Sequence, residues 1–358
     1  MRKNLTRSLT RVDELVAAGL ADGGTRVELE TVAARYAVAV TPAMADLIPP
    51  HAPDDPMALQ FVPRAEELTI LAGERADPIG DDVHSPTPGL VHRYRDRALL
   101  KLASVCPVYC RFCFRREMVG PGGEAMLTSG ELDAAFAYIA GHPEIWEIVI
   151  SGGDPLILSP RRLAGVMQRL AAIDHVRVVR FHSRVPLVAP ERITSELVET
   201  LRGAGKAAWV VLHVNHAREF TPAGRAALAL LADGGVPLLS QSVLLRGVND
   251  NAAALEALLR ACVENRIKPY YLHQGDLVPG ASHLRTTIAE GQALMRDLRG
   301  RLSGVAQPTY VLDIPGGFGK SPIGPNYICD DPDQAGGALV ADPSGQIHRY
   351  PPDGAGED

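Results

Sequence analysis

Three cysteines within eight positions are the residues of this 358-residue chain best placed to do chemistry. They form the pattern Cys106-x3-Cys110-x2-Cys113. A short loop with this spacing can wrap three thiolates around one iron–sulfur cluster. Three ligands on a four-iron cluster leave one iron without a protein ligand, which is the open site that cofactor or substrate chemistry needs. The spacing therefore predicts a [4Fe–4S] cluster with one free iron.

A structural zinc site is the alternative for these cysteines. Zinc loops usually supply their ligands in pairs and close the shell at four, and no second pair of Cys or His lies near in the sequence. The two remaining cysteines, Cys262 and Cys329, are isolated. The odd total of five fits reduced thiolates better than a disulfide framework, so we expect a reducing compartment.

A second reactive position is Lys320, which ends the segment Pro315-Gly-Gly-Phe-Gly-Lys. The glycines allow close backbone approach and unusual dihedral angles. A lysine held in this way can form a Schiff base with pyridoxal phosphate. Two alternatives stay open. The segment is a solvated turn, or it is a nucleotide-binding loop, although its glycine spacing is too short for the Gly-x4-Gly-Lys pattern of such loops.

The elements that must position these residues are six apolar or β-branched runs that alternate with helical patterns. Ser159 and Thr221 each precede a proline and an apolar stripe, and Thr128 and Glu131 have the spacing of a capping box. Six βα units are fewer than the eight of a closed barrel. We therefore predict an α/β fold, a partial (β/α)6 barrel of the TIM type with functional groups at the C-terminal ends of its strands. The expected strands lie near residues 98–105, 147–151, 176–182, 208–214, 237–245 and 269–273.

The sequence divides into three segments. Residues 1–85 are expected to be a mainly helical extension, residues 86–321 the barrel, and residues 322–358 a short tail that wraps the barrel or frays. A net charge of -6 gives no broad basic surface, so nucleic acid is not an expected partner. No apolar run approaches the roughly 18 residues of a membrane-spanning helix, and the N-terminus does not resemble a signal peptide. We expect a soluble, cytoplasmic protein.

The segment Cys113-Phe-Arg-Arg-Glu extends the cysteine pattern, and with it the chain resembles the lysine 2,3-aminomutase family of radical S-adenosylmethionine (SAM) enzymes. The resemblance covers about residues 93–350. It implies that the open iron chelates SAM and that an electron from the cluster cleaves SAM to a 5′-deoxyadenosyl radical. Without the resemblance, the Gly-Gly-Asp-Pro segment after the second strand is also an ordinary turn. The implied SAM contacts are Ser151, Gly152, Gly153 and Asp154 at the methionine end, and His213 and Gln241 at the ribose and adenine.

The same resemblance assigns a pyridoxal phosphate site. The family carries its cofactor lysine in a Pro-Gly-Gly-Gly-Gly-Lys segment, which implies this role for Lys320, although Phe318 here replaces one glycine. Arg93 and Arg97 are implied to bind the phosphate. Arg93, Arg95 and Arg97 recur at spacing two and would share one face of an extended segment. The alternative for these arginines is an exposed basic edge.

Two aspartates and one arginine indicate the substrate. Asp276 and Asp313 could together hold a distal ammonium by charge-assisted hydrogen bonds, unless each caps a helix or a turn. Both match the aspartates that the family uses for the lysine ε-ammonium, and Arg115 matches its arginine for the substrate carboxylate. Arg116 beside it is expected to be structural or exposed. The implied reaction is an isomerisation, the 2,3-migration of an amino group that converts L-lysine to β-lysine.

Several alternatives and partners accompany this interpretation. The short tail also resembles the branch that makes β-lysine for the modification of elongation factor P, and the enzyme could act on another amino acid. An iron–sulfur protein for electron transfer would need neither Lys320 nor the aspartates, and a radical SAM enzyme of other chemistry would lack pyridoxal phosphate. An electron donor such as flavodoxin or ferredoxin is expected. Cys329 is the only cysteine of the tail, so the zinc site of larger family members is not expected, and a homo-oligomer stays open.

Overall fold

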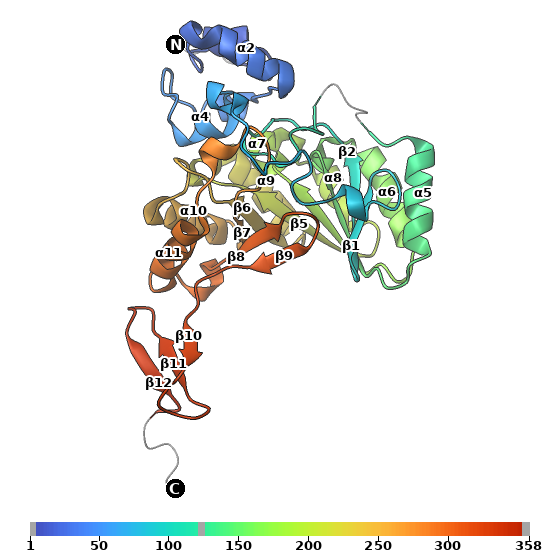
Figure 1. Cartoon of the computed structure of the whole chain (residues 1–358). Helices are drawn as coiled ribbons and strands as arrows, with labels where there is room; N and C mark the ends of the chain where they lie inside the picture. The colour runs from blue at the N-terminus through green and yellow to red at the C-terminus, as the bar shows by residue number, and fades with distance from the viewer. Residues whose placement is uncertain (1–4, 121–125, 353–358) are drawn as a thin grey trace.

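The computed structural model describes residues 5–120 and 126–352 and shows a barrel of strands wrapped by helices (Figure 1). Nine strands form one sheet in chain order, from β1 to β9, and the strands from β2 to β8 run parallel. The predicted α/β partial barrel is confirmed. Its parallel strands are β2 (Arg97–Ala103), β3 (Glu147–Gly152), β4 (Val178–Ser183), β5 (Ala207–His213), β6 (Leu238–Val243), β7 (Ile267–His273) and β8 (Thr309–Ile314).

The helices that cover the barrel begin where the sequence places their caps. The hydroxyls of Ser159 and Thr221 accept hydrogen bonds from the first helical turn, and Thr128 forms the predicted capping box with Glu131. In the described part of the chain, no helix is long and apolar enough to cross a lipid bilayer. The covering helices are α5 (Ser129–Ala140), α6 (Pro160–Ala171), α7 (Val185–Val188), α8 (Ser195–Arg202), α9 (Pro222–Asp233), α10 (Ala252–Glu264) and α11 (Ile288–Arg299).

The barrel has a seventh parallel strand, β8, that the sequence analysis did not predict. It pairs with β7 and then turns back into β9 (Gly319–Pro322), so that Asp313 lies opposite Lys320. Only Tyr310 and Val311 of its six residues are buried, and proline and glycines follow directly. The run Thr309-Tyr-Val-Leu-Asp-Ile is rich in strand-forming residues, so the sequence could have predicted this strand.

The N-terminal segment packs four short helices on the cysteine loop rather than on the strands. Their buried side chains, such as Met44 and Phe61, share one apolar cluster with Val108 of that loop and Val188 of α7. Figure 1 shows this segment at one end of the molecule. The helices are α1 (Val12–Ala17), α2 (Arg26–Arg35), α3 (Pro42–Ala45) and α4 (Pro56–Phe61).

A buried carboxylate joins the N-terminal segment to the cysteine loop. Glu67 is fully buried and forms ion pairs with Arg111 and Arg116, which flank Cys113. Arg116 is therefore structural, as expected, and its guanidinium also lies over the ring of Tyr36 at 3.6 Å. Burial raises the pKa of Glu67, but the charges and hydrogen bonds of the two arginines outweigh burial, so the pKa lies below its ordinary value.

The tail differs from the expected wrapping or fraying segment. It forms a separate antiparallel sheet of three strands that projects from the barrel, at the opposite end from the N-terminal helices (Figure 1). Its strands have only three or four residues, and glycine, proline and aspartate separate them, so their sequence signal is weak. They are β10 (Ile328–Asp330), β11 (Ala338–Ala341) and β12 (Ile347–Tyr350). The division of the chain at residues 85 and 321 stays a prediction.

Replacing Glu67 tests the buried ion pairs. Glu67→Gln leaves two buried guanidinium groups without their counter-charge, so we expect the free energy of unfolding to fall by about 3–5 kcal/mol. Urea denaturation of the metal-free protein, followed by circular dichroism, measures this change. Glu30→Gln removes an exposed partner of Arg26 and is the matched control, with an unchanged midpoint expected. Equal midpoints for the two variants would contradict the assignment.

Candidate active site

The three cysteines lie on the loop that follows β2, and all three line one small pocket of about 40 Å³. Burial raises the pKa of Cys113 to about 11, and the nearby Cys110 shifts it in the same direction. Burial also raises the pKa of Cys106, with contributions from Cys113 and Cys110. With their pKa values raised, these half-buried thiols are protonated at neutral pH, so metal binding here releases protons.

The polar surroundings of the cysteines fit an iron–sulfur cluster. Among the described residues, no group of three or more His, Cys, Asp or Glu side chains is arranged around one metal ion. The cysteines of a [4Fe–4S] cluster each bind a different iron, so their sulfurs need not converge on one point. A buried donor, Nε of Arg184, also has no partner among the described residues, and Nη1 of the same side chain contacts Cys110 Sγ. Sulfur acceptors in this loop suit such a donor.

The glycines after β3 allow the strand end to approach the cysteine loop. Gly152 has a positive φ of 106°, and a Cβ there would lie 2.5 Å from the carbonyl oxygen of Ala103. A Cβ on Gly153 would collide with the carbonyl oxygen of Val105. These contacts require glycine for packing reasons alone. A SAM contact for either residue stays a prediction.

Asp154 is used inside the protein and does not line the main cavity. Its carboxylate accepts hydrogen bonds from the hydroxyl of Ser183 at 2.7 Å and from the backbone N–H groups of Arg184 at 2.7 Å and Leu156 at 3.1 Å. These bonds fix the end of β4 against the end of β3. A SAM contact for Asp154 stays a prediction.

Most of the predicted site residues line one cavity of about 270 Å³. The wall is built from side chains at the C-terminal ends of the parallel strands, from the β1 hairpin and from the β8–β9 hairpin. Convergence at this end of a parallel barrel is the rule for functional groups. The predicted residues in the wall are Arg93, Arg97, Arg115, Ser151, His213, Gln241, Asp276, Asp313 and Lys320.

The cofactor lysine candidate is paired with an aspartate across the β8–β9 hairpin. Nζ of Lys320 donates to Oδ2 of Asp313 and lies 3.4 Å from Nδ1 of His273. The backbone N–H of Lys320 donates to the hydroxyl of Tyr94 at 2.8 Å, which fixes the hairpin against β1. Phe318, which departs from the family's glycine pattern, is 80% exposed and therefore does not fill the site.

Two of the predicted arginines share a carboxylate that the sequence analysis did not identify. Asp81 accepts from Nη2 of Arg93 at 3.0 Å and from Nη2 of Arg115 at 2.9 Å. Asp81 is almost fully buried and lines the cavity. Its position in a polar stretch of the N-terminal segment gave no signal, because the contacts are with residues far along the chain.

The three arginines near residue 95 do not lie on one extended segment, as the sequence analysis supposed. β1 (Leu90–Tyr94) contains Arg93, and a turn then reverses the chain into β2, so Arg93 and Arg97 lie on neighbouring antiparallel strands. Arg95 in the turn is exposed. Arg97 lies over the ring of Tyr94 at 3.9 Å. Both Arg93 and Arg97 still reach the cavity.

The two predicted substrate carboxylates have opposite electrostatic surroundings. Burial raises the pKa of Asp276 to about 7, and the charge of Asp313 acts in the same direction. Burial also raises the pKa of Asp313, but a hydrogen bond from His273 and the charge of Lys320 outweigh burial, so its pKa lies well below the ordinary value. Asp313 is therefore ionised at neutral pH, and Asp276 is close to its titration point.

Several buried polar atoms of the cavity wall have no hydrogen-bond partner among the described residues. They are Nε of Arg93 and the Nε2 atoms of His182, His213 and His273. Burial lowers the pKa values of the three histidines, so their rings are neutral. Unpaired donors and acceptors of this kind are rare in native interiors and fit a site built for polar ligands.

Family models and curated relatives match most of the chain. A Radical SAM superfamily model matches residues 100–259, and a lysine-2,3-aminomutase model matches residues 295–351. An L-lysine 2,3-aminomutase of Clostridium subterminale is 43% identical over 291 residues, which are 81% of this chain and 70% of the relative. The chain belongs to the lysine 2,3-aminomutase family of radical SAM enzymes. Relatives of the same name from Escherichia coli (40% identity, 80% of this chain and 83% of theirs) and Bacillus subtilis (37%, 92% and 68%) agree.

Membership in the lysine 2,3-aminomutase family identifies the chain as a radical SAM isomerase. Such enzymes use a [4Fe–4S] cluster and SAM, and the cysteine loop stays the predicted site of the cluster. Three charged or polar residues near the site were not predicted from the sequence: Asp81, His182 and Arg184. His182 and Arg184 lie at or just after the C-terminal end of β4, and a search for polar residues at every strand end would have found both.

Iron content tests the three cysteine ligands. Cys106→Ala, Cys110→Ala and Cys113→Ala each remove a direct ligand, so we expect a loss of iron and sulfide binding beyond the ~10–100-fold typical of outer-shell changes. Cys329→Ala is the matched control, because this cysteine is exposed and lies in the tail sheet. Anaerobic reconstitution with iron and sulfide, followed by metal analysis, gives the measurement. Full iron content in any of the three loop variants would remove that cysteine from the ligand set.

Proposed function

We propose that the protein is a pyridoxal phosphate-dependent radical SAM aminomutase that converts L-lysine to β-lysine. The observation that carries the proposal is one cavity with an arginine on the cluster loop and two aspartates on the opposite strands. Arg115 follows Cys113 by two residues, whereas Asp276 follows β7 and Asp313 lies on β8. The names of the relatives support the same substrate.

The charges of the cavity orient a lysine molecule in one direction. Arg115 attracts the α-carboxylate, which places the reacting carbons on the side of the cluster loop. Asp276 and Asp313 attract the ε-ammonium at the other side by charge-assisted hydrogen bonds. A glutamate side chain would bring a third carboxylate toward the two aspartates, and this repulsion selects against it.

Pyridoxal phosphate fits the residues at the β1 and β9 edges of the cavity. Lys320 would hold its aldehyde carbon, and Arg93 and Arg97 its phosphate, with the unpaired Nε of Arg93 as a further donor. When bound, this cofactor supplies a π system that stabilises an unpaired electron next to nitrogen. Asp313 forms an ion pair with the ammonium of Lys320, and the hydroxyl of Tyr94 accepts a hydrogen bond from the lysine backbone N–H.

SAM fits the side of the cavity nearest the cysteines. Ser151, His213 and Gln241 contribute side chains there, and the ring of Phe112 from the cysteine loop stacks on His213 with centroids 5.5 Å apart. When reduced by the cluster, SAM supplies the radical that begins the reaction. The chain's own task is to hold the reacting carbons close together and away from water.

The cellular setting is part of the proposal. The single electron for the cluster is assigned to a flavodoxin or ferredoxin, and the enzyme to the cytoplasm, because a reduced cysteine loop needs a reducing compartment. The alternative destination of the product is the modification of elongation factor P, which deletion of the gene would then abolish. A homo-oligomer is compatible with the projecting tail sheet. Light scattering of the purified protein would measure its molar mass and so its oligomeric state.

Product analysis tests the reaction. We expect the anaerobically reconstituted enzyme, with SAM, pyridoxal phosphate and dithionite, to convert lysine to β-lysine. Lys320→Ala should abolish this conversion and also remove the absorbance band of lysine-bound pyridoxal phosphate. Lys268→Ala, at an exposed lysine that donates to the carbonyl of Gln307, is the control and should retain both. Cleavage of SAM without consumption of lysine would refute the substrate assignment.

The pH dependence of lysine binding follows from Asp276. Its carboxyl has a raised pKa of about 7, so it is neutral below that pH and charged above it. We expect kcat/KM for lysine to fall as the pH drops through about 7, by up to about tenfold per pH unit for a single proton. The bound ammonium keeps the carboxylate charged, so kcat itself should change less.

Asp276→Asn supplies the comparison for this pH profile. It removes a charge-assisted hydrogen bond of about 1.5–3 kcal/mol, so kcat/KM should fall about 10–100-fold at high pH. The acidic limb of the profile should also disappear. If the limb persists in the variant, a group other than Asp276 titrates.

A further inference from the structure

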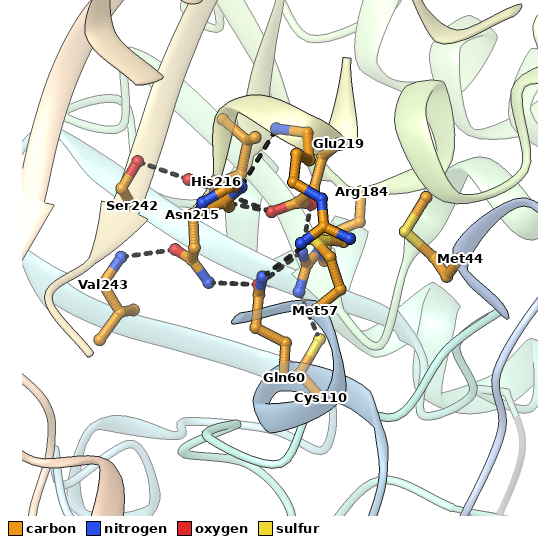
Figure 2. A network of polar contacts seen from close by, with 12 residues as sticks. Met44, Met57, Gln60, Cys110, Arg184, Asn215, His216, Glu219, Ser242 and Val243 are labelled. Atoms are coloured by element: carbon orange, nitrogen blue, oxygen red, sulfur yellow. Dashed lines mark hydrogen bonds and ion pairs between the residues drawn. The ribbon is translucent and has the colours of Figure 1, made fainter. Parts of the chain in front are cut away.

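A buried arginine lies against one cysteine of the cluster loop. Arg184 follows β4 directly, and its Nη1 donates a hydrogen bond to Sγ of Cys110 at 2.9 Å. Its side chain is only 7% exposed. Figure 2 shows the guanidinium between Cys110 and Glu219. Neither lysine binding nor the pyridoxal phosphate site uses this arginine.

On the side away from Cys110, the guanidinium of Arg184 pairs with the carboxylate of Glu219, which backbone hydrogen bonds hold in place. Oε2 of Glu219 accepts from Nη2 of Arg184 at 2.5 Å, and Glu219 is fully buried. The second oxygen of Glu219 accepts from the backbone N–H groups of Asn215 at 2.9 Å and His216 at 3.0 Å (Figure 2). These backbone bonds fix the carboxylate just beyond the end of β5.

The N-terminal segment completes the same network. Oε1 of Gln60, on α4, accepts from Nη2 of Arg184 at 3.2 Å and from Nδ2 of Asn215 at 3.1 Å. The backbone carbonyl of Gln60 accepts from the N–H of Arg111 in the cysteine loop at 2.9 Å. Asp154 fixes the backbone of Arg184. The same hydrogen-bond network therefore positions both Arg184 and the cysteine loop.

Stability alone does not account for this arrangement. A buried ion pair contributes little more to folding than well-packed apolar residues of the same size, and often less. The contact with a ligand sulfur has another effect. Hydrogen bonds and charges near the sulfurs of an iron–sulfur cluster shift its reduction potential. Reduction adds one negative charge, so a nearby cation favours the reduced cluster and a nearby anion opposes it.

We propose that Arg184 and Glu219 set the reduction potential of the [4Fe–4S] cluster through the hydrogen bond to Cys110. Arg184 raises the potential, and Glu219 limits that increase by neutralising the charge from the far side. The step concerned is the transfer of one electron from a flavodoxin or ferredoxin-type donor to the cluster, with no proton or leaving group. Arg184 is a positioning residue in this reaction and contacts the cluster only through its cysteine ligand.

Two substitutions should move the potential in opposite directions. Arg184→Gln removes the cation and should lower the ratio of reduced to oxidised cluster at a fixed potential about tenfold, which is 59 mV for one electron. Glu219→Gln removes the anion and should raise that ratio. Redox titration of the reconstituted cluster, followed by electron paramagnetic resonance without lysine or pyridoxal phosphate, measures both. A failed lysine assignment therefore leaves this test intact.

Further variants separate the proposal from a structural role. Arg184→Lys keeps the charge and should restore most of the potential. Arg285→Gln removes another partly buried arginine, which pairs with Glu74 rather than a cysteine, and should leave the potential unchanged. If Arg184→Gln fails to hold a cluster, the reduction potentials of Arg184→Lys and Glu219→Gln test the proposal instead. A potential that is unchanged or lower in Glu219→Gln, or shifts in the same direction in both Gln variants, overturns the proposal.

Discussion

The buried carboxylate of Glu67 is the interaction on which the cysteine loop depends. The loop carries two arginines between and beside its cysteines, and neither could be buried without an anion. That anion comes from the N-terminal segment, which also supplies the apolar side chains beneath the loop. The extension is thus part of the structure that holds the cysteine loop. The barrel strands alone do not provide the charge or the apolar surface that the loop requires.

Charged residues of the cavity are satisfied internally before any ligand arrives. Asp81 forms ion pairs with Arg93 and Arg115, and Asp313 forms one with Lys320. Each pair avoids the cost of an unpaired buried charge. Ligand binding therefore exchanges one ionic partner for another, and the net gain is smaller than the ligand contacts alone suggest. The carboxyl of Asp276 has no such cation in hydrogen-bonding contact among the described residues, although Arg285 donates to its backbone carbonyl, and the pKa of this carboxyl is raised.

The sequence predicted the parts of the fold and site that carry strong local patterns. Six βα units, the helix caps at Thr128, Ser159 and Thr221, and the grouping of nine candidate residues in one cavity followed from such patterns and from family resemblance. The tail strands were missed because their apolar runs are short and glycine, proline and aspartate separate them, whereas the strand-forming residues of β8 were overlooked. Asp81, Glu67 and Arg184 were missed for another reason. Their partners are distant in the chain, and nothing in their local sequence marks a buried charge.

The open seam of the barrel has a mechanical consequence. β1 and β9 are its two edge strands, and the described contact between them is the hydrogen bond from the backbone of Lys320 to Tyr94. Arg93 lies on one edge and Lys320 on the other. A cofactor that contacts both residues would link β1 to β9 and so connect the two edges of the sheet. Loading of the cofactor would then stiffen the whole barrel as well as equip the site, and its loss would first loosen the two edges.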